Sequence, residues 1–260
     1  RCNVEILEDI INDTNTLLSL ADECKTNNID AYCEVLKDEF AGPIIANPVK
    51  YEYVKNAPFL SFVTSNYDPL LAHNIRGIRH DILTHIKGLD IRMLDSAIYY
   101  IHGYVEVNGE VDRDQLILSK SDFDREYNPN GFGNIRDFLM QLIKYNSVLF
   151  VGCRLTEEPL QDLLELCQAS KQRAVGESKN KHYILLPEEK LTLSEDLDDT
   201  DEEFRSESSE NIYDRYGISV VRYKRVKDDK HIELLNLLEK WSNLKKPQVA
   251  SPMSSGEPEL

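Results

Sequence analysis

Three short groups of polar residues, each placed directly after an apolar run, carry the side chains most able to do chemistry. The first is residues 64–68, which read Thr-Ser-Asn-Tyr-Asp. The second is the pair His102-Gly103, and the third is the turn that begins at Gly152. Open α/β sheets bind ligands outside the carboxyl ends of their strands. The three groups therefore predict one ligand crevice.

The group at residues 64–68 has features of a phosphate or ribose site. A strand end followed by a helix start presents free N–H groups and the positive end of a helix dipole. Asn66 adds an amide that both donates and accepts, so it can orient a water or a sugar hydroxyl. A simpler interpretation is that Thr64 and Ser65 satisfy turn backbone while Asn66 and Asp68 cap a helix. The five residues alone favour that simpler interpretation.

His102 stands at the end of a predicted strand, between Ile101 and Gly103. Histidine is the usual general base at neutral pH because its unperturbed pKa is about 6.5. Gly103 permits close approach of a ligand or an unusual backbone angle. A lone histidine is more often a buried residue whose ring nitrogens bond to backbone, and that alternative stays open.

The turn that begins at Gly152 leads from a predicted core strand into a helix. One interpretation brings Gly152 and Cys153 close to a nucleotide, with Arg154 near a phosphate. In the other, the acidic residues at 157 and 158 simply suit the positive end of the helix dipole, and Cys153 is a core thiol.

The elements that must position these groups alternate between strands and helices. This alternation favours an α/β fold with a mostly parallel sheet, helices on both of its faces and an additional N-terminal helical portion. Ser121 is expected to cap a helix that runs through Tyr127. We predict strands at Phe59–Val63, Ile98–Ile101, Leu116–Leu118, Val148–Val151, His182–Leu186 and Ile218–Tyr223. We predict helices at Val4–Ala21, Ile29–Phe40, Pro69–Arg76, Ile135–Tyr145, Pro159–Ala169 and Ile232–Trp241.

Charge and cysteine content exclude several classes of function. The 260 residues carry a formal net charge of −16, and a nucleic-acid binder needs a basic face to neutralise phosphates. Direct nucleic-acid binding and docking on an anionic membrane are therefore not expected. The five cysteines show no C-x-x-C spacing, which argues against a disulfide framework and a structural zinc site. With no apolar run of about 18 residues and no signal peptide, we expect a cytoplasmic protein.

Composition also suggests where the folded part ends. Residues 194–210 form an acidic, serine-rich run that is expected to be a surface insertion. Residues 247–260 are rich in Pro, Ser, Gly and Glu and are expected to be a disordered tail. We therefore expect one ligand-binding domain over residues 1–246. Because residue 1 is Arg and not Met, and the chain opens at the predicted helix of residues 4–21, we expect that a preceding stretch is missing.

Taken together, the motifs resemble the sirtuin-like domain family over about residue 59 to the last helix. Residues 64–68 look like its T-T-N-Y-D signature, and Ile101-His102-Gly103 looks like its H-G signature. Residues 151–157 look like its later G-x-S-x-x-D/E turn, with Arg154 where the family usually has Ser. The resemblance implies a Rossmann-like NAD-binding domain.

The resemblance also narrows the expected reaction. Deacylases of the family carry a four-cysteine zinc module soon after the H-G motif, whereas residues 103–147 of this chain contain no cysteine. The chain therefore looks closer to bacterial anti-phage NAD hydrolases such as the Thoeris, HerA-associated and short-Argonaute-associated effectors. That likeness implies an oligomer that depletes NAD, no metal, and a partner such as a HerA-type ATPase or an Argonaute. The family's glycine-rich G-A-G-x-S loop is absent here, and we expect it in a missing N-terminal stretch.

The resemblance assigns roles to individual residues. Asn66 would place the attacking water and the ribose hydroxyls, and His102 would act as general base or hold a ribose hydroxyl. The remaining NAD contacts are expected from Thr64, Ser65, Asp68, Gly103, Gly152, Cys153, Arg154 and Tyr223, the last by stacking on adenine. The alternatives are a non-catalytic domain that binds NAD or ADP-ribose, as a sensor or as a scaffold in an oligomeric complex, and a zinc-free protein deacylase.

Overall fold

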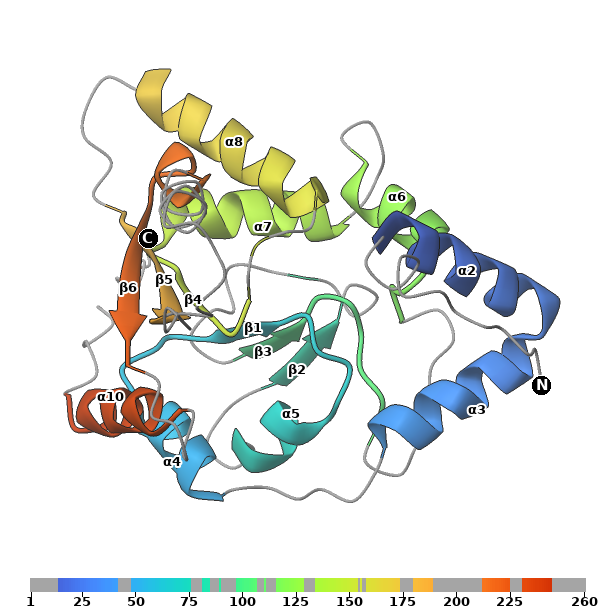
Figure 1. The fold of residues 1–260 in the computed structure, drawn as a ribbon, viewed down its shortest axis with the longest axis horizontal. Coiled ribbons are helices and arrows are strands. Elements are labelled where there is room, and N and C mark those ends of the chain that lie inside the picture. Colours follow the sequence, from blue (N-terminus) through green and yellow to red (C-terminus); the bar gives the residue numbers. More distant parts are fainter. Residues whose placement is uncertain are drawn as a thin grey trace, which may run out of the picture.

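The chain forms an α/β fold built on parallel strands (Figure 1). A computed structural model describes residues 14–41, 48–75, 81–84, 89, 97–106, 110, 116–128, 134–153, 155, 158–173, 180–188, 212–224 and 231–244. Its strands are β1 (Phe62–Thr64), β2 (Asp81–Thr84), β3 (Ala97–Tyr100), β4 (Leu149–Val151), β5 (His182–Pro187) and β6 (Ile218–Tyr223). Its helices are α2 (Thr14–Asn27), α3 (Ile29–Phe40), α4 (Pro48–Asn56), α5 (Leu70–Ile75), α6 (Lys120–Tyr127), α7 (Asn134–Tyr145), α8 (Glu158–Arg173) and α10 (Ile232–Ser242).

The described strands pair in two three-stranded sheets, with the orders β1-β3-β2 and β4-β5-β6. All four strand pairings are parallel. Parallel strands have their carboxyl ends at the same edge of a sheet, so each sheet gathers the residues that follow its strands. The parallel α/β fold predicted from the sequence is confirmed.

Strand β3 is buried on both of its faces, with all four residues 0% exposed. Ala97 and Tyr99 point into a core that is shared with helix α7, where Tyr99 packs against Phe138 at a ring-centroid distance of 4.6 Å. Ile98 and Tyr100 point to the opposite side, into a core with residues of α4 and α5. Helices therefore cover both faces of this sheet, as the sequence predicts.

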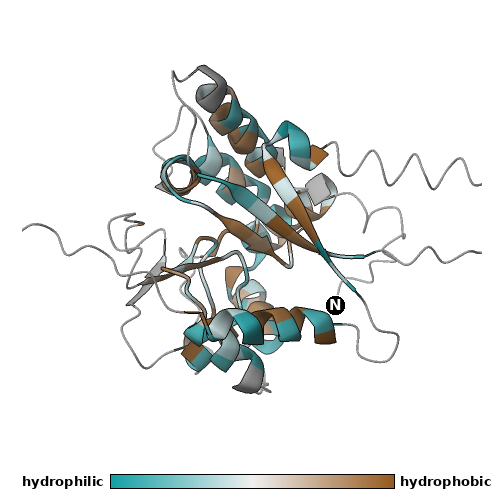
Figure 2. Ribbon diagram, turned by 90° about the vertical axis from the view of Figure 1, so that its left-hand side faces the viewer, coloured by the Kyte–Doolittle hydropathy of each residue, from teal (hydrophilic) through white to brown (hydrophobic). Residues whose placement is uncertain are grey.

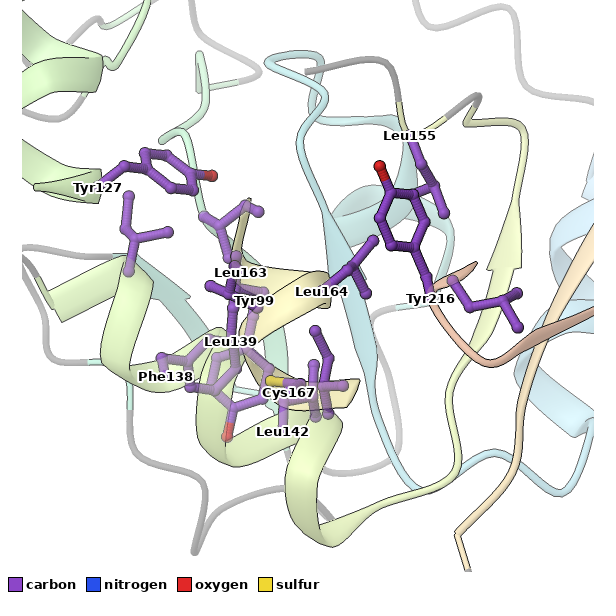
Figure 3. Packing of buried hydrophobic residues seen from close by; sticks show 14 of the residues in the cluster. Tyr99, Tyr127, Phe138, Leu139, Leu142, Leu155, Leu163, Leu164, Cys167 and Tyr216 are labelled. Atoms are coloured by element: carbon purple, nitrogen blue, oxygen red, sulfur yellow. The ribbon is translucent and has the colours of Figure 1, made fainter. Parts of the chain in front are cut away.

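One face of the second sheet packs on helices α7 and α8 (Figure 3). Ile184 of β5 and Ile218 of β6 join Leu163 and Leu164 of α8 in one buried cluster. The pattern of hydropathy matches this arrangement: the strands are largely hydrophobic, and the helices carry both hydrophobic and hydrophilic residues (Figure 2). Burial of these apolar side chains is the main source of stability for this layer.

Helices α2 and α3 form an N-terminal arm beside the first sheet (Figure 1). Helix α3 buries Leu36 against Val105 and Leu116. Helix α2 contacts α6 through charged groups: Lys25 Nζ lies 2.8 Å from both carboxylate oxygens of Asp122. The side chain of Asp122 is 2% exposed, so the ion pair compensates a charge that water does not reach.

Most predicted elements are confirmed to within a few residues, but three predictions are wrong. Residues Leu116–Leu118 form no strand, although the N–H of Ile117 donates to the His102 carbonyl at 3.0 Å. The cap of α6 is Ser119 and not Ser121: Ser119 and Asp122 form a reciprocal capping box. Helix α2 extends past Ala21 to Asn27, where its polar end bonds to α6, and residues 4–13 of the predicted helix lie outside the described residues.

The predicted surface insertion at residues 194–210 and the predicted disordered tail at residues 247–260 lie outside the described residues. Strand β2 lies in a region to which no element was assigned from the sequence, and helix α4 directly precedes the segment that leads into β1.

The first prediction concerns the ion pair of the arm. Lys25→Met should lower the free energy of unfolding by about 1–3 kcal/mol, because it leaves the buried Asp122 carboxylate with fewer partners. Lys120→Met removes an exposed pair with Asp124 at 3.8 Å and should change the value by less than about 0.5 kcal/mol. Urea unfolding monitored by circular dichroism measures both, and equal losses would contradict a special role of Lys25.

The second prediction is a dependence on pH. Burial raises the pKa of Asp122, but hydrogen bonds from Lys25 and Ser119 outweigh it and hold the pKa below its ordinary value of 3.8. A lowered pKa means that the unfolded chain binds protons first, so this stabilisation is complete above the ordinary value and is lost as pH falls below it.

Asp122→Asn should therefore destabilise the protein at pH 7, and the difference from the wild type should shrink as the pH is lowered through about 4 towards 3. Asp124→Asn, at an exposed position on the same helix, is the matched control and should show no such trend. A constant difference for Asp122→Asn across this range would contradict the assignment.

Candidate functional site

The ends of strands β1 and β3 bring the first two polar groups side by side. Thr64 pairs with Tyr100 in the parallel register, and the N–H of Ile101 donates to the Thr64 carbonyl at 3.1 Å. Asn66 and His102 each follow two residues after this pair. The two residues that the sequence singles out for catalysis thus leave neighbouring strands at the same level of one sheet edge.

The turn at residues 64–68 satisfies much of its own backbone. Thr64 Oγ1 accepts a hydrogen bond from the N–H of Asn66 at 3.1 Å. Asp68 Oδ1 accepts from the N–H of Leu70 at 3.0 Å, at the start of α5. Thr64 and Asp68 therefore have the turn and cap roles of the simpler interpretation. Ser65 and Asn66 have exposed side chains.

Tyr67 fixes this turn against the rest of the protein. Its hydroxyl donates to the Ile117 carbonyl at 2.6 Å, and its own carbonyl accepts from the N–H of Val105 at 2.7 Å. Its ring centroid lies 5.2 Å from that of Phe40 in the arm and 6.4 Å from that of His102. The residue next to Asn66 is thus held by the arm, by the segment after β3 and by the His102 ring.

His102 is 3% exposed and lies among aromatic rings. Phe123 meets it edge-on with ring centroids 5.0 Å apart. Its Nε2 lies 2.8 Å from the hydroxyl of Tyr127, within hydrogen-bond distance. This burial is what the alternative of a core histidine predicts, although Nε2 bonds to a side-chain hydroxyl and not to backbone. Gly103 adopts φ +79°, a left-handed angle that glycine tolerates best, and closes a turn onto the Tyr100 carbonyl.

The second sheet supplies the turn after β4. Gly152 has φ +72°, and a Cβ added there would meet nothing within 4 Å, so the turn leaves open space beside its backbone. Leu155 also has a positive φ, +54°, and its buried side chain anchors the turn in the core. Cys153 is half-buried and packs against that core, as expected of a core thiol. Arg154 lies outside the described residues.

Tyr223 ends strand β6 and is 7% exposed. Its hydroxyl lies 3.0 Å from Nδ1 of His231, the residue that precedes α10, and the two rings are 6.0 Å apart. Its carbonyl accepts from the N–H of Glu188 at 2.7 Å, which ties β6 to the end of β5. The predicted stacking of Tyr223 on adenine stays a prediction.

The predicted site residues thus fall into two groups. Thr64, Ser65, Asn66, Asp68, His102 and Gly103 lie together at the end of the first sheet. Gly152, Cys153 and Tyr223 lie at the end of the second. A buried cluster that includes Tyr127 and Leu155 runs between them, and Leu163 and Leu164 lie between these two side chains in Figure 3.

Sequence reasoning missed Tyr127. It closes helix α6, and its ring stacks on Phe123 one turn earlier with centroids 5.7 Å apart. The spacing of Phe123 and Tyr127 is a helical i, i+4 pair, which predicts a shared helix face but not a contact with His102.

The described part of the chain lacks two other kinds of feature. Within it, no group of three or more His, Cys, Asp or Glu residues is arranged to hold a metal ion. None of the helices described there is long and apolar enough to cross a membrane.

Comparison with known proteins gives a family match. The family model described as "SIR2-like domain" matches residues 60–218, which contain the strand ends at 64–68, 102–103 and 152–153. No curated protein matches the chain.

A third prediction separates the cap role of Asp68 from a binding role. Asp68→Ala should destabilise the protein by about 1 kcal/mol, because the N–H of Leu70 loses its acceptor. Asp68→Asn should stay within about 0.5 kcal/mol of the wild type, because asparagine caps as well as aspartate. Thermal unfolding measures both, and equal losses in the two variants would contradict the cap.

Proposed function

The chain belongs to the SIR2-like domain family, and on that premise we propose that it hydrolyses NAD at the bond between nicotinamide and ribose. The family points to NAD-related chemistry in general, and the proposal names one reaction within it. The observation that carries the proposal is the pairing of an exposed amide, Asn66, with a buried imidazole, His102, at the ends of adjacent parallel strands.

The reaction adds one water and breaks one bond. The N-glycosidic bond of NAD breaks, nicotinamide leaves with the bonding electron pair, and positive charge develops on the ribose. A water oxygen then bonds to the ribose carbon and gives up a proton, which leaves ADP-ribose. Asn66 orients the water and the ribose hydroxyls by its amide, and His102 takes the proton or holds a ribose hydroxyl.

The charge of the chain supports backbone recognition of the diphosphate. With a net charge of −16, there is little basic surface to bind phosphate. Glycine turns with left-handed φ angles expose consecutive N–H groups that bind anions. Gly152 has such an angle and open space beside it, whereas the N–H of Gly103 already donates to the Tyr100 carbonyl. We assign the phosphates to the turn at Gly152, together with Ser65 and Thr64.

A second candidate function is binding of NAD or ADP-ribose without turnover. The specific observation in its favour is that Nε2 of His102 is engaged by Tyr127, so the ring is not open to substrate on that nitrogen. In this case Asn66 and the turns bind the nucleotide, and the domain acts as a sensor or as a scaffold within an oligomeric complex.

At the level of the cell, we propose that the reaction depletes NAD during phage infection. The support is the likeness of the motifs to anti-phage NAD hydrolases and the lack of cysteine between His102 and Val148, where deacylases carry their zinc module. We further propose that the active form is a cytoplasmic oligomer with a protein partner such as a HerA-type ATPase or an Argonaute.

The fourth prediction tests the catalytic pair. Asn66→Ala and His102→Gln should each lower the rate of nicotinamide release from NAD by about 100-fold or more, because each removes a group that acts on the reacting atoms. The matched controls are Asn56→Ala and His73→Ala, which change an exposed asparagine on α4 and an exposed histidine on α5. Chromatography of released nicotinamide gives the rates, and circular dichroism confirms the fold.

The same assay separates the three functions. Release of nicotinamide from NAD alone supports the hydrolase, and release only with an acyl-lysine peptide supports a deacylase. Calorimetric binding of NAD with no release supports the binding domain. Wild-type rates in both Asn66→Ala and His102→Gln would overturn the proposed site.

A further inference from the structure

The bond between His102 and Tyr127 joins two buried groups from distant parts of the chain. Tyr127 is 8% exposed and His102 is 3% exposed, and 2.8 Å separates Nε2 from the phenol oxygen. A hydrogen bond between side chains in a low-dielectric interior is stronger than one in water, and losing it leaves a buried polar atom less well satisfied.

A tyrosine hydroxyl suits a histidine that changes its protonation state. The hydroxyl donates to an unprotonated ring nitrogen and accepts from a protonated one. The same contact therefore holds the ring in one orientation before and after proton transfer. A backbone carbonyl at this position would accept only, and it would favour the protonated nitrogen throughout.

Helix α6 holds Tyr127 in turn. The ring stacks on Phe123 with an interplanar angle of 21°, and it lies in the same buried cluster as Ile101, the residue before His102. At the other end of the helix, the capping box of Ser119 and Asp122 fixes the first turn, and Lys25 of the arm binds Asp122. Both ends of α6 are thus fixed, so the phenol oxygen has a defined place.

We propose that Tyr127 is a positioning residue for His102: its hydroxyl holds the imidazole in a single orientation. The consequence for NAD cleavage rests on the proposed function. A general base that rotates spends part of its time in an unproductive orientation, so loss of the hydroxyl lowers the rate of the chemical step more than the affinity for NAD.

The decisive variant is Tyr127→Phe, which keeps the aromatic packing and removes only the hydroxyl. The matched control is Tyr104→Phe: Tyr104 is also buried, two residues after His102, and its hydroxyl bonds to Glu106 at 3.2 Å instead of to the imidazole. Thermal unfolding verifies that both variants fold.

The first readout does not need an activity. Long-range ¹H–¹⁵N NMR spectra report the protonation and hydrogen bonding of each histidine ring nitrogen, and the His102 signals are those that disappear in His102→Gln. In Tyr104→Phe, we expect the same His102 nitrogen shifts as in the wild type. In Tyr127→Phe, the Nε2 shift should move, because that nitrogen loses its hydrogen bond to the phenol. An unchanged Nε2 shift in Tyr127→Phe, or an equal change in Tyr104→Phe, overturns the proposal.

The second readout is steady-state hydrolysis of NAD. Tyr127→Phe should lower kcat about tenfold and leave KM within about twofold, since the hydroxyl acts on the base and does not touch NAD. Tyr104→Phe should keep both constants. An enzyme with no NAD turnover at all contradicts the proposed function but leaves the NMR result to decide the role of Tyr127. Normal turnover with wild-type kcat in Tyr127→Phe contradicts the positioning role alone.

Discussion

Complete burial of strand β3 is the constraint on which the candidate site depends. A strand that is packed on both faces and paired on both edges has no freedom to shift along or rotate about its axis. The chain therefore leaves the sheet at a fixed point, and this point determines where the next residues, Ile101 and His102, lie. The β1 register then fixes Asn66 relative to His102, because Thr64 pairs with the last residue of β3.

A second constraint ties the N-terminal arm to this site through electrostatics. A carboxylate as buried as that of Asp122 is tolerated only when charged and hydrogen-bonding partners surround it, and α2 supplies the closest cation. Asp22 adds a bond to the N–H of Ser121, and Phe40 of α3 packs on Tyr67. The arm thus contacts the neighbours of both proposed catalytic residues: Tyr67 beside Asn66, and α6, which carries Tyr127. The position of the arm therefore affects the positions of Asn66 and His102.

The sequence predicted the strands that are rich in apolar residues and missed what depends on tertiary contacts. Strand β3 is a buried apolar run, and β5 and β6 are short runs rich in apolar residues, so the positions of these strands follow from local pattern alone. Residues 116–118 have the same local pattern, but their backbone bonds to the chain after β3 at one point and not to a ladder. The choice between Ser119 and Ser121 as a cap depends on Asp22. This residue lies on helix α2, 99 residues earlier in the chain, and it accepts a hydrogen bond from the N–H of Ser121. For the same reason the polar groups at 64–68 and 102–103 were predictable, while the contact of Tyr127 with His102 was not.

The environment of His102 bears on the choice between catalysis and binding. A ligand-binding domain needs polar atoms that face its ligand, and the exposed Asn66 and the glycine turns already meet that need. An imidazole that is 3% exposed contributes little to binding from solvent, and burying it costs free energy that a hydrogen bond only offsets. A general base gains from such burial, because the ring then has a fixed orientation in a site that excludes water. Preorganised groups in a low-dielectric environment act most strongly on a reacting bond. The surroundings of His102, with one hydroxyl partner and aromatic walls, fit this second need better than the first.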